Sequence, residues 1–339
     1  MDRGQPHTVA LRPLPTTPSP TPTTRLAPSP TGALHLGNAR TFLVTWALAR
    51  QQNMRIVLRI EDLDTPRVKP GVLDLTIDLL TWLGIDWDTG PIIQSHDLRH
   101  HHAAMQHLVA NRNAFPDTHT RRELEALASP QSAPNEGSHE LVFPALLRPT
   151  TLPTTFTDNA PAWRFMTPSE PVPFNDQFAG PQTTHPAQTI GDFIIWTRRD
   201  AATPGQPAYQ LAVVVDDFRQ AITHVIRGDD LIESTGRQLL LARALGHATQ
   251  PTYLHLPLVR GSDGRRLAKR HGDTRLDTYR DRGVSAERVI GLIAHWSGVT
   301  ASRIAMSAAD FRSALQLSTI PKGPITFTAE DDAWLLARS

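Results

Sequence analysis

The stretch RLAPSPTGALHLGNAR, running from Arg25 to Arg40, decides the fold of the sequence around it. Its Pro-Ser-Pro-Thr-Gly turn leads into residues 35–52, where apolar side chains recur at helical spacing. The first turn of such a helix offers free backbone N–H groups and the positive end of the helix dipole, which together suit a phosphate. His35 and Asn38 occupy that turn and would donate to the same phosphates. The stretch therefore predicts a phosphate site, although in isolation such a turn more often only caps a helix.

Outward from this stretch, the sequence alternates between buried strands and amphipathic helices. Residues 55–60 form a strand after the first helix, which completes a βαβ opening. The pattern breaks at 129–188, where Pro, Ser and Thr are frequent, so we expect a loop-rich insertion and not more of the central sheet. The remaining expected strands are 190–196, 209–215, 222–227 and 253–259, and the remaining expected helices are 71–83, 97–112, 120–128, 230–245, 285–297 and 307–316. This alternation predicts an α/β fold with a parallel sheet.

The predicted organisation has five segments. A Pro- and Thr-rich tail opens the chain and is expected to be disordered. Two halves of one sheet domain follow, separated by the insertion, and a basic loop with helices closes the chain. In order, the segments are 1–24, 25–112, 113–189, 190–260 and 261–339.

Composition excludes several classes of site. The 339 residues carry 34 Lys and Arg against 33 Asp and Glu, so the overall charge gives no indication of a nucleic-acid partner. The absence of cysteine removes disulfides, thiol nucleophiles and thiolate zinc sites. The sequence has neither an apolar run that could span a bilayer nor the order of a signal peptide. We therefore expect a cytoplasmic protein that does not bind membranes.

A group of carboxylates follows the strand at 55–60. Glu61, Asp62 and Asp64 come directly after it, and the carboxyl edge of a parallel sheet is where ligands usually bind. A solvated strand end with a turn would produce the same pattern. Arg227 ends the strand at 222–227, where a lone arginine would more often form a surface ion pair.

The stretch from Arg25 to Arg40 resembles the HIGH region of class I aminoacyl-tRNA synthetases of the glutamyl type, whose signature is close to RFAPSPTGxLHIGxAR. Asn38 departs from the second histidine of that tetrapeptide. The resemblance implies a Rossmann-like, doubly wound parallel sheet with an inserted loop-rich subdomain and a short C-terminal helical region. It also implies catalytic roles for His35 and Asn38, ATP binding by His35, Gly37 and Asn38, and glutamate binding by Arg25, Leu26, Ala27, Pro28 and Ser29.

Three further residues match the glutamate pocket of this family. Glu61, in the RIEDLD segment, aligns with the carboxylate that holds the α-amino group of the substrate. Arg227 ends a THVIRG block and, with Arg25, is the candidate for binding the side-chain carboxylate through two parallel hydrogen bonds. Tyr209 aligns with a tyrosine that lines the pocket, whereas by itself it would as readily belong to the core.

The segment from Arg266 to Arg270 resembles the KMSKS loop of the same family, with arginine in place of the first lysine and of the serine. Flexible basic loops are usually solvated surface turns. However, the sequence has only three lysines, Lys69, Lys269 and Lys322, and one of them stands where the family binds the triphosphate. We therefore predict that Lys269 is catalytic, binds ATP and stabilises the leaving pyrophosphate.

Metal ligands are scarce in the segment that many relatives use to bind zinc. Asp117 and His119 stand where those relatives carry Cys-x-Cys, and the later ligand positions align with Phe143 and Leu147, which cannot bind zinc. We predict that the protein has no structural zinc and no metal among its site residues. A site without cysteine near Asp117 and His119 stays open.

The resemblance implies that the chain activates L-glutamate with ATP, accompanied by Mg²⁺, as a glutamyl-adenylate, and acts as a monomer. Few residues follow Arg270, fewer than an anticodon-binding domain needs. This architecture is similar to the glutamyl-queuosine tRNA(Asp) synthetases, which transfer glutamate to the queuosine base of tRNA(Asp). Two alternatives remain: a minimal synthetase that charges the 3′ end of tRNA, and a catalytically silent relative that binds tRNA.

Overall fold

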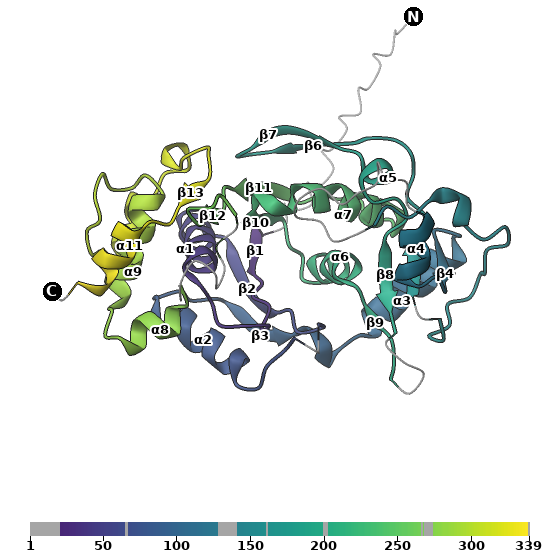
Figure 1. Ribbon diagram of the computed structural model, residues 1–339, viewed down its shortest axis with the longest axis horizontal. Coiled ribbons are helices and arrows are strands. Elements are labelled where there is room, and N and C mark those ends of the chain that lie inside the picture. The colour runs from purple at the N-terminus through teal and green to yellow at the C-terminus, as the bar shows by residue number, and fades with distance from the viewer. Residues whose placement is uncertain are drawn as a thin grey trace, which may run out of the picture.

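The computed structural model describes residues 21–64, 67–127, 141–160, 162–198, 203–265, 267 and 274–337. Three groups of elements follow one another along its longest axis (Figure 1). A parallel sheet lies in the middle, helices of the C-terminal part lie at one end, and an antiparallel sheet from the middle of the chain lies at the other. Within the described ranges, none of the helices combines the length and the apolar character that crossing a bilayer would demand.

The central sheet is built from two hydrogen-bonded groups of parallel strands. One group is β1 (Thr23–Leu26), β2 (Arg55–Ile60) and β3 (Thr89–Ile93), and the other pairs β10 (His224–Gly228) with β11 (Thr252–Leu256). The groups join because the Thr223 N–H donates to Thr23 O and the Thr24 hydroxyl donates to His224 O, both at 2.9 Å. The resulting order, β3-β2-β1-β10-β11, reverses between β1 and β10. The predicted Rossmann-like parallel sheet is therefore confirmed.

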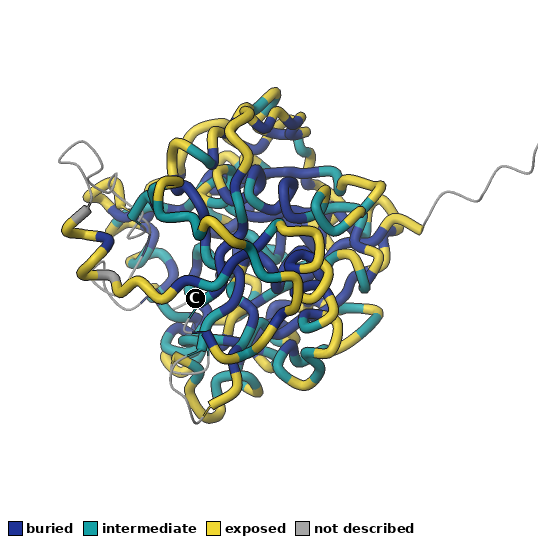
Figure 2. The backbone as a smooth tube through the Cα atoms, turned by 90° about the vertical axis from the view of Figure 1, so that its right-hand side faces the viewer, coloured by how far each residue is buried: buried dark blue, intermediate teal, exposed yellow. Residues whose placement is uncertain are grey.

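Both faces of this sheet are covered, and Figure 2 shows the buried backbone gathered in the interior. In β2, Ile56, Leu58 and Ile60 contribute to one core, whereas Val57 contributes to the other, as expected for alternating side chains. The first core is shared with α1 (Leu36–Gln51), α8 (Leu276–Asp281), α9 (Ala286–Trp296), α10 (Ala308–Ala314) and α11 (Ala329–Leu336). The second is shared with α3 (Arg99–Ala110), α6 (Tyr209–Arg219) and α7 (Ile232–Ala244).

The region predicted as a loop-rich insertion contains strands. An antiparallel sheet runs in the order β4 (Ala114–Asp117), β5 (Ala162–Phe165), β8 (Ile194–Thr197) and β9 (Gln206–Pro207). The strand expected at 190–196 is β8 and belongs here, not to the parallel sheet, so that assignment was wrong. A hairpin of β6 (Val172–Asp176) and β7 (Gly180–Thr184) also joins β11.

The pairing of β6 with β11 contradicts the expectation that the insertion adds nothing to the central sheet. The contact joins Asp176 to Tyr253 in parallel register. Burial alternates along β6, but the strand is short and contains Pro173, so its pattern was too brief to recognise from the sequence.

The segment 209–215 was expected to be a strand and is the start of α6. Every residue from Gln210 to Asp216 is buried, because α6 is packed between the sheet, α3 and α7. A helix that is covered on all sides loses its periodic polar face, and its run of valines then has the composition of a strand. The physical cause of the error is therefore tertiary burial.

The other elements are short connections around these layers. They are α2 (Val72–Trp82), η1 (Gln94–His96), α4 (Arg121–Leu127), η3 (Ala145–Leu147), α5 (Pro186–Thr189), η4 (Asp229–Leu231), β12 (Val259–Arg260), η6 (Leu317–Thr319) and β13 (Ile325–Thr326). A capping box starts α4, since Thr120 and Glu123 exchange hydrogen bonds.

The contact between α7 and the β6–β7 hairpin gives a stability test. A Cβ on Gly236 would stand 1.9 Å from the hydroxyl of Thr184 on β7. Replacing a glycine within a helix by alanine normally stabilises a protein. At this position we expect the opposite: Gly236→Ala should lower the free energy of unfolding by about 1–3 kcal/mol, because the added methyl group overpacks the contact with β7. The matched control is Gly323→Ala, because no atom lies within 4 Å of the new Cβ. Equal urea midpoints for Gly236→Ala and the parent would contradict the close packing.

Candidate active site

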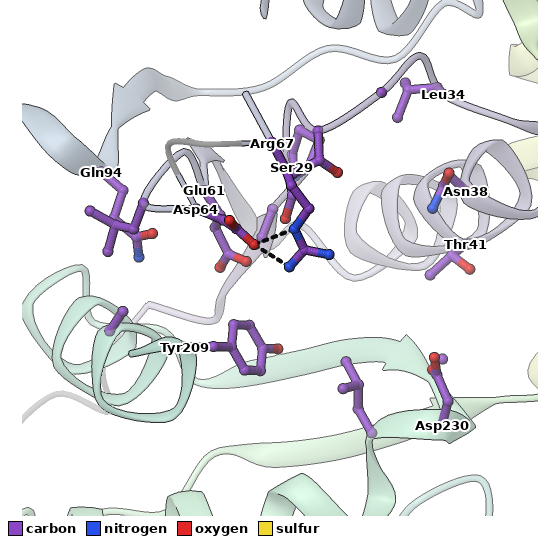
Figure 3. Close-up of a pocket in the computed structure, with 18 of the residues that line it drawn as sticks. Ser29, Leu34, Asn38, Thr41, Glu61, Asp64, Arg67, Gln94, Tyr209 and Asp230 are labelled. Atoms are coloured by element: carbon purple, nitrogen blue, oxygen red, sulfur yellow. Dashed lines mark hydrogen bonds and ion pairs between the residues drawn. The ribbon is translucent and has the colours of Figure 1, made fainter. Parts of the chain in front are cut away.

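A cavity of about 1000 Å³ opens at the carboxyl ends of the parallel strands, next to the reversal between β1 and β10. Its wall includes the turn after β1, the start of α1, the ends of β2 and β3, and the start of α6 (Figure 3). This crevice is where open α/β sheets bind ligands. Of the predicted residues, those that line it are Ala27, Pro28, Ser29, His35, Gly37, Asn38, Glu61 and Tyr209.

The start of α1 differs from the expected array of free donors. His35 is the N-cap residue, and its Nδ1 accepts from the Gly37 N–H at 3.1 Å, while Asn38 Oδ1 accepts from the His35 N–H at 3.3 Å. The Leu36 N–H donates to Thr274 O at 3.0 Å. The prediction that the first backbone N–H groups are free is wrong in this structure, because the capping box engages those of His35 and Gly37 and the Thr274 carbonyl engages that of Leu36. What this end of α1 offers the cavity is the side chains of His35 and Asn38.

Gly37 is required by the same cap. A Cβ at this position would approach Cε1 of His35 to 3.1 Å, so any larger residue would push the imidazole away from the helix end. The glycine thus keeps the His35 ring folded over the first turn of α1.

A buried charge network lies under the cavity. Arg59 is fully buried in β2, and its guanidinium bonds Glu61 at 2.9 Å and Asp217 of α6 at 2.7 Å. Burial raises the pKa of the Glu61 carboxyl, and the positive charges of Arg59 and Arg25 oppose that rise. Glu61 is therefore a partly desolvated carboxylate on the cavity wall, suited to an ammonium group.

The three other residues assigned to glutamate lie behind the wall. Leu26 is fully buried in the core shared with α1, so its side chain does not reach the cavity. Arg25 and Arg227 are each 5% exposed, and Arg25 pairs with Asp217 at 3.6 Å. Among the residues that the structure describes, nothing accepts a hydrogen bond from Arg25 Nε or Arg227 Nη1. Two buried guanidinium groups thus keep unused donors close to the site.

Tyr209 stands across the cavity from Glu61 and Asp64, at the first position of α6 (Figure 3). Its side chain is 41% exposed because it faces the open space of the cavity. Desolvation by the surrounding cavity walls raises the pKa of Tyr209, an effect that the charge of Arg227 opposes. The ring can therefore close one side of an amino-acid pocket while its hydroxyl serves as a neutral donor.

Lys269, Arg266 and Arg270 lie outside the described residues, so the lysine is not placed. Residues on both sides of it are anchored next to the cavity. The Leu267 N–H donates to Val259 O at 3.2 Å, and Val259 lines the cavity. Downstream, Thr274 O accepts from Leu36 at the start of α1.

Two residues on the wall were missed by the sequence analysis. Gln94 follows β3, and its Nε2 donates to the buried carboxylate of Asp216 at 2.6 Å, so its carbonyl oxygen is left for the cavity. Arg67 also lines the cavity and pairs with Asp64 (Figure 3). The rule that ligands bind at the carboxyl ends of parallel strands could have found Gln94, had β3 been recognised.

Asp117 and His119, at the positions of zinc ligands in relatives, belong to an ion cluster. Asp117 is buried, and its carboxylate is 2.7 Å from His119 Nδ1 and 2.5 Å from Arg164 Nε on β5. The Arg164 guanidinium lies 4.1 Å from the ring centroid of Phe143. Within the described ranges, no three His, Asp or Glu side chains gather in a way that could hold a metal ion. The Arg164 guanidinium thus neutralises Asp117.

Comparison with known proteins gives a consistent result. Residues 22–329 match the family model "tRNA synthetases class I (E and Q), catalytic domain". The chain is 45% identical to a glutamyl-Q tRNA(Asp) synthetase of Rhodopirellula baltica over 81% of this chain and 84% of that protein. It is 41% identical to another from Symbiobacterium thermophilum, over 92% and 97%. A glutamate-tRNA synthetase crystal structure from Elizabethkingia anophelis is similar at a TM-score of 0.75 and 25% identity, over 93% of this chain and 70% of that one.

The Asp117–Arg164 cluster gives a stability prediction. Arg164→Leu should lower the free energy of unfolding by about 3–5 kcal/mol, because it leaves the buried Asp117 carboxylate without its guanidinium. The control is Arg99→Leu, which removes an exposed pair with Asp97 and should leave the melting temperature unchanged. A metal chelator should also leave the melting temperature of the parent unchanged, and a drop on chelation would mean that a metal contributes to this fold.

Proposed function

The chain belongs to the class I tRNA synthetases of the glutamate and glutamine type, and on that premise we propose that it activates L-glutamate with ATP and transfers it to the queuosine base of tRNA(Asp). The observation that carries this proposal is the cavity at the sheet reversal. There a desolvated carboxylate, Glu61, faces Tyr209, and the guanidinium groups of Arg25 and Arg227 lie behind the wall. Glutamate carries one ammonium and two carboxylate groups, so this set of charges complements it.

The amino acid is proposed to bind with its ammonium group on Glu61 and its side-chain carboxylate toward Arg227. Ser29 and the backbone of Ala27 and Pro28 form the adjoining wall, and Tyr209 closes the opposite side. Arg25 adds positive charge from below. This orientation leaves the α-carboxylate pointing along the cavity toward the start of α1, where ATP is proposed to lie.

Activation requires one bond to form and one to break at the α-phosphorus of ATP. An oxygen of the α-carboxylate of glutamate attacks that phosphorus. Pyrophosphate leaves with the electron pair of the bond between the α-phosphorus and the bridging oxygen. The side chains of His35 and Asn38 are proposed to hold the phosphates, Gly37 to leave room for the His35 ring beside them, and Lys269 to neutralise the departing pyrophosphate. Leu267 and Thr274, anchored beside the cavity, support this role because Lys269 is two residues from the first of them.

Mg²⁺ is proposed to accompany ATP as a phosphate-bound ion, for which Asp64 and Asp230 offer carboxylates on the cavity wall. Arg67 already engages Asp64. The ion would supply positive charge to the triphosphate.

We further propose that the protein is a monomer and that this reaction takes place in the cytoplasm.

The second part of the proposal is the identity of the RNA group that accepts glutamate. Its support is that two glutamyl-Q tRNA(Asp) synthetases are 45% and 41% identical to this chain and that the chain spans 84% and 97% of their lengths. The alternative, charging of a tRNA 3′ end, has the support of the similar glutamate-tRNA synthetase structure. A catalytically silent tRNA-binding relative is the third candidate, and the positions of Glu61, Tyr209 and Arg227 favour catalysis over it.

Glutamate affinity should depend on pH through Glu61. Burial raises the pKa of this carboxyl, so protonation removes the anion at a higher pH than for an ordinary glutamate side chain. Affinity should therefore be full above that pKa and should weaken as the pH falls through it. Calorimetric titration with L-glutamate from pH 7 downward measures this, and Glu61→Gln should weaken binding about tenfold or more and abolish the acid limb. Asp64→Asn is the control and should keep the acid limb. An unchanged pH profile in Glu61→Gln would contradict the assignment.

Glutamate-dependent ATP–pyrophosphate exchange tests activation. The parent should catalyse exchange, and Lys269→Ala should reduce its rate about 10²–10³-fold, the usual loss when a charge-stabilising donor is removed. Arg122→Ala is the control, since that exposed cation lies on α4 and is not among the residues that line the cavity, so its removal should leave the rate unchanged.

Transfer assays then separate the acceptors. We expect labelled glutamate to appear on tRNA(Asp) that contains queuosine and not on tRNA(Asp) without it. Charging of the 3′ end of tRNA(Glu) would replace the queuosine proposal by the alternative. Absence of exchange with every amino acid, in protein that still binds tRNA, would identify the silent relative.

A further inference from the structure

Arg227 is held from behind by a row of buried side chains that comes from two neighbouring strands. Its Nε donates to His255 Nε2 at 3.0 Å, and His255 Nδ1 is 2.6 Å from Asp176 Oδ2. Arg227 on β10 and His255 on β11 are direct partners in the sheet, and Asp176 lies on β6, the next strand. The three residues are 5%, 1% and 2% exposed.

The direction of each hydrogen bond in this row is determined by chemistry. A guanidinium can only donate, so His255 Nε2 must be the acceptor and carry no proton. The ring proton is then on Nδ1 and is donated to the carboxylate of Asp176. Burial lowers the pKa of His255, helped by the charges of Arg227 and Arg25, while Asp176 opposes the shift. A neutral imidazole of defined tautomer thus separates the acid from the arginine.

Asp176 is itself held in one orientation. Its Oδ1 accepts from the Phe178 and Ala179 N–H groups at 2.9 and 2.6 Å, in the turn of the β6–β7 hairpin. Its Oδ2 also accepts from the His255 N–H at 3.1 Å. The hairpin turn therefore orients the carboxylate, the carboxylate orients the imidazole, and the imidazole orients Arg227.

The remaining contacts of Arg227 explain what this orientation achieves. Nη2 donates to Thr235 Oγ1 at 2.8 Å and to Leu231 O at 3.3 Å. With Nε and Nη2 engaged, Nη1 is the nitrogen that has no acceptor among the described residues. Two parallel hydrogen bonds to a carboxylate cannot come from the Nε and Nη2 edge, because His255 and Thr235 occupy that edge.

We propose that Asp176 and His255 are positioning residues that fix the guanidinium of Arg227 with Nη1 directed to the side chain of the amino-acid substrate, and so help select a carboxylate over an amide. This inference rests on the proposed function. An amide in place of the carboxylate would leave the buried charge of Arg227 without an anion, whereas a free guanidinium could turn away from such a ligand.

The experiment compares the parent with His255→Leu, His255→Gln and Phe174→Leu. The leucine variant removes the acceptor for Arg227. The glutamine variant restores an acceptor and a donor in one amide. Phe174→Leu is the matched control. The centroid of the Phe174 ring lies 6.3 Å from that of His255, but a phenylalanine takes no part in the row of hydrogen bonds. For each protein, KM and kcat for glutamate, glutamine and ATP are measured by pyrophosphate exchange, glutamate binding by calorimetry, and unfolding by heat.

We expect His255→Leu to raise KM for glutamate about tenfold or more, with KM for ATP unchanged, and to reduce the preference for glutamate over glutamine. His255→Gln should restore KM for glutamate and the preference for glutamate over glutamine to values near those of the parent. Phe174→Leu should lower the melting temperature while leaving KM and the preference as in the parent. If His255→Leu and the parent differ less than twofold in KM for glutamate and in preference, while the parent is active, the inference is wrong.

A separate measurement covers the case in which His255→Leu does not fold or the parent does not catalyse exchange. Nitrogen-15 NMR of the parent at neutral pH should show a signal of a neutral histidine with its proton on Nδ1 that is missing in His255→Gln. A charged ring or an Nε2–H tautomer for His255 would overturn the row of bonds. If exchange is absent but His255→Leu still weakens glutamate binding in calorimetry, the proposed function fails and the positioning role stands; if the parent binds no glutamate, both fail.

Discussion

The structure of this protein depends on how it buries the guanidinium of Arg59. A charge without solvent in a parallel sheet would cost several kcal/mol, so it must be neutralised where it lies. Glu61 on the same strand and Asp217 on α6 do this, at 2.9 and 2.7 Å. The pairing joins the first half of the sheet to a helix from the second half. It also leaves Glu61 at the cavity wall in a desolvated state, so one interaction serves both the fold and the proposed site.

The cavity is a product of the same junction. The two strand groups meet where Thr23 and Thr24 of β1 bond the segment at Thr223 and His224. Residues from the turn after β1, from the end of β2 and from α6 thereby face one space. Positive charge from Arg25 and Arg227 lies beneath it. An anionic amino acid is thus attracted into a place where its ammonium group also finds a partner.

The inserted region contributes more than connections. Its β6–β7 hairpin extends the second strand group and supplies Asp176, which bonds His255 next to Arg227. Its other sheet is held by Arg164, whose guanidinium bonds Asp117 and lies over Phe143. In both places a buried carboxylate accepts hydrogen bonds from groups of the chain itself. The same chemical solution therefore stabilises the insertion and orients a residue of the proposed site.

The sequence by itself determined the elements whose signals are local. The turn that leads into the first helix, the strand before Glu61 and the positions of Ser29, His35 and Tyr209 follow from motifs, spacing and the family resemblance, and Ser29, His35, Glu61 and Tyr209 line one cavity. Only the tertiary structure decided the rest. The valine-rich segment after Tyr209 has the composition of a strand but forms part of α6, where it is buried on all sides. The His35 side chain accepts a hydrogen bond from the Gly37 N–H at the start of its own helix, although the sequence analysis expected that donor to be free. Gln94, Asp176 and His255 gain their significance from contacts between segments far apart in the chain, and no short-range pattern can report such contacts.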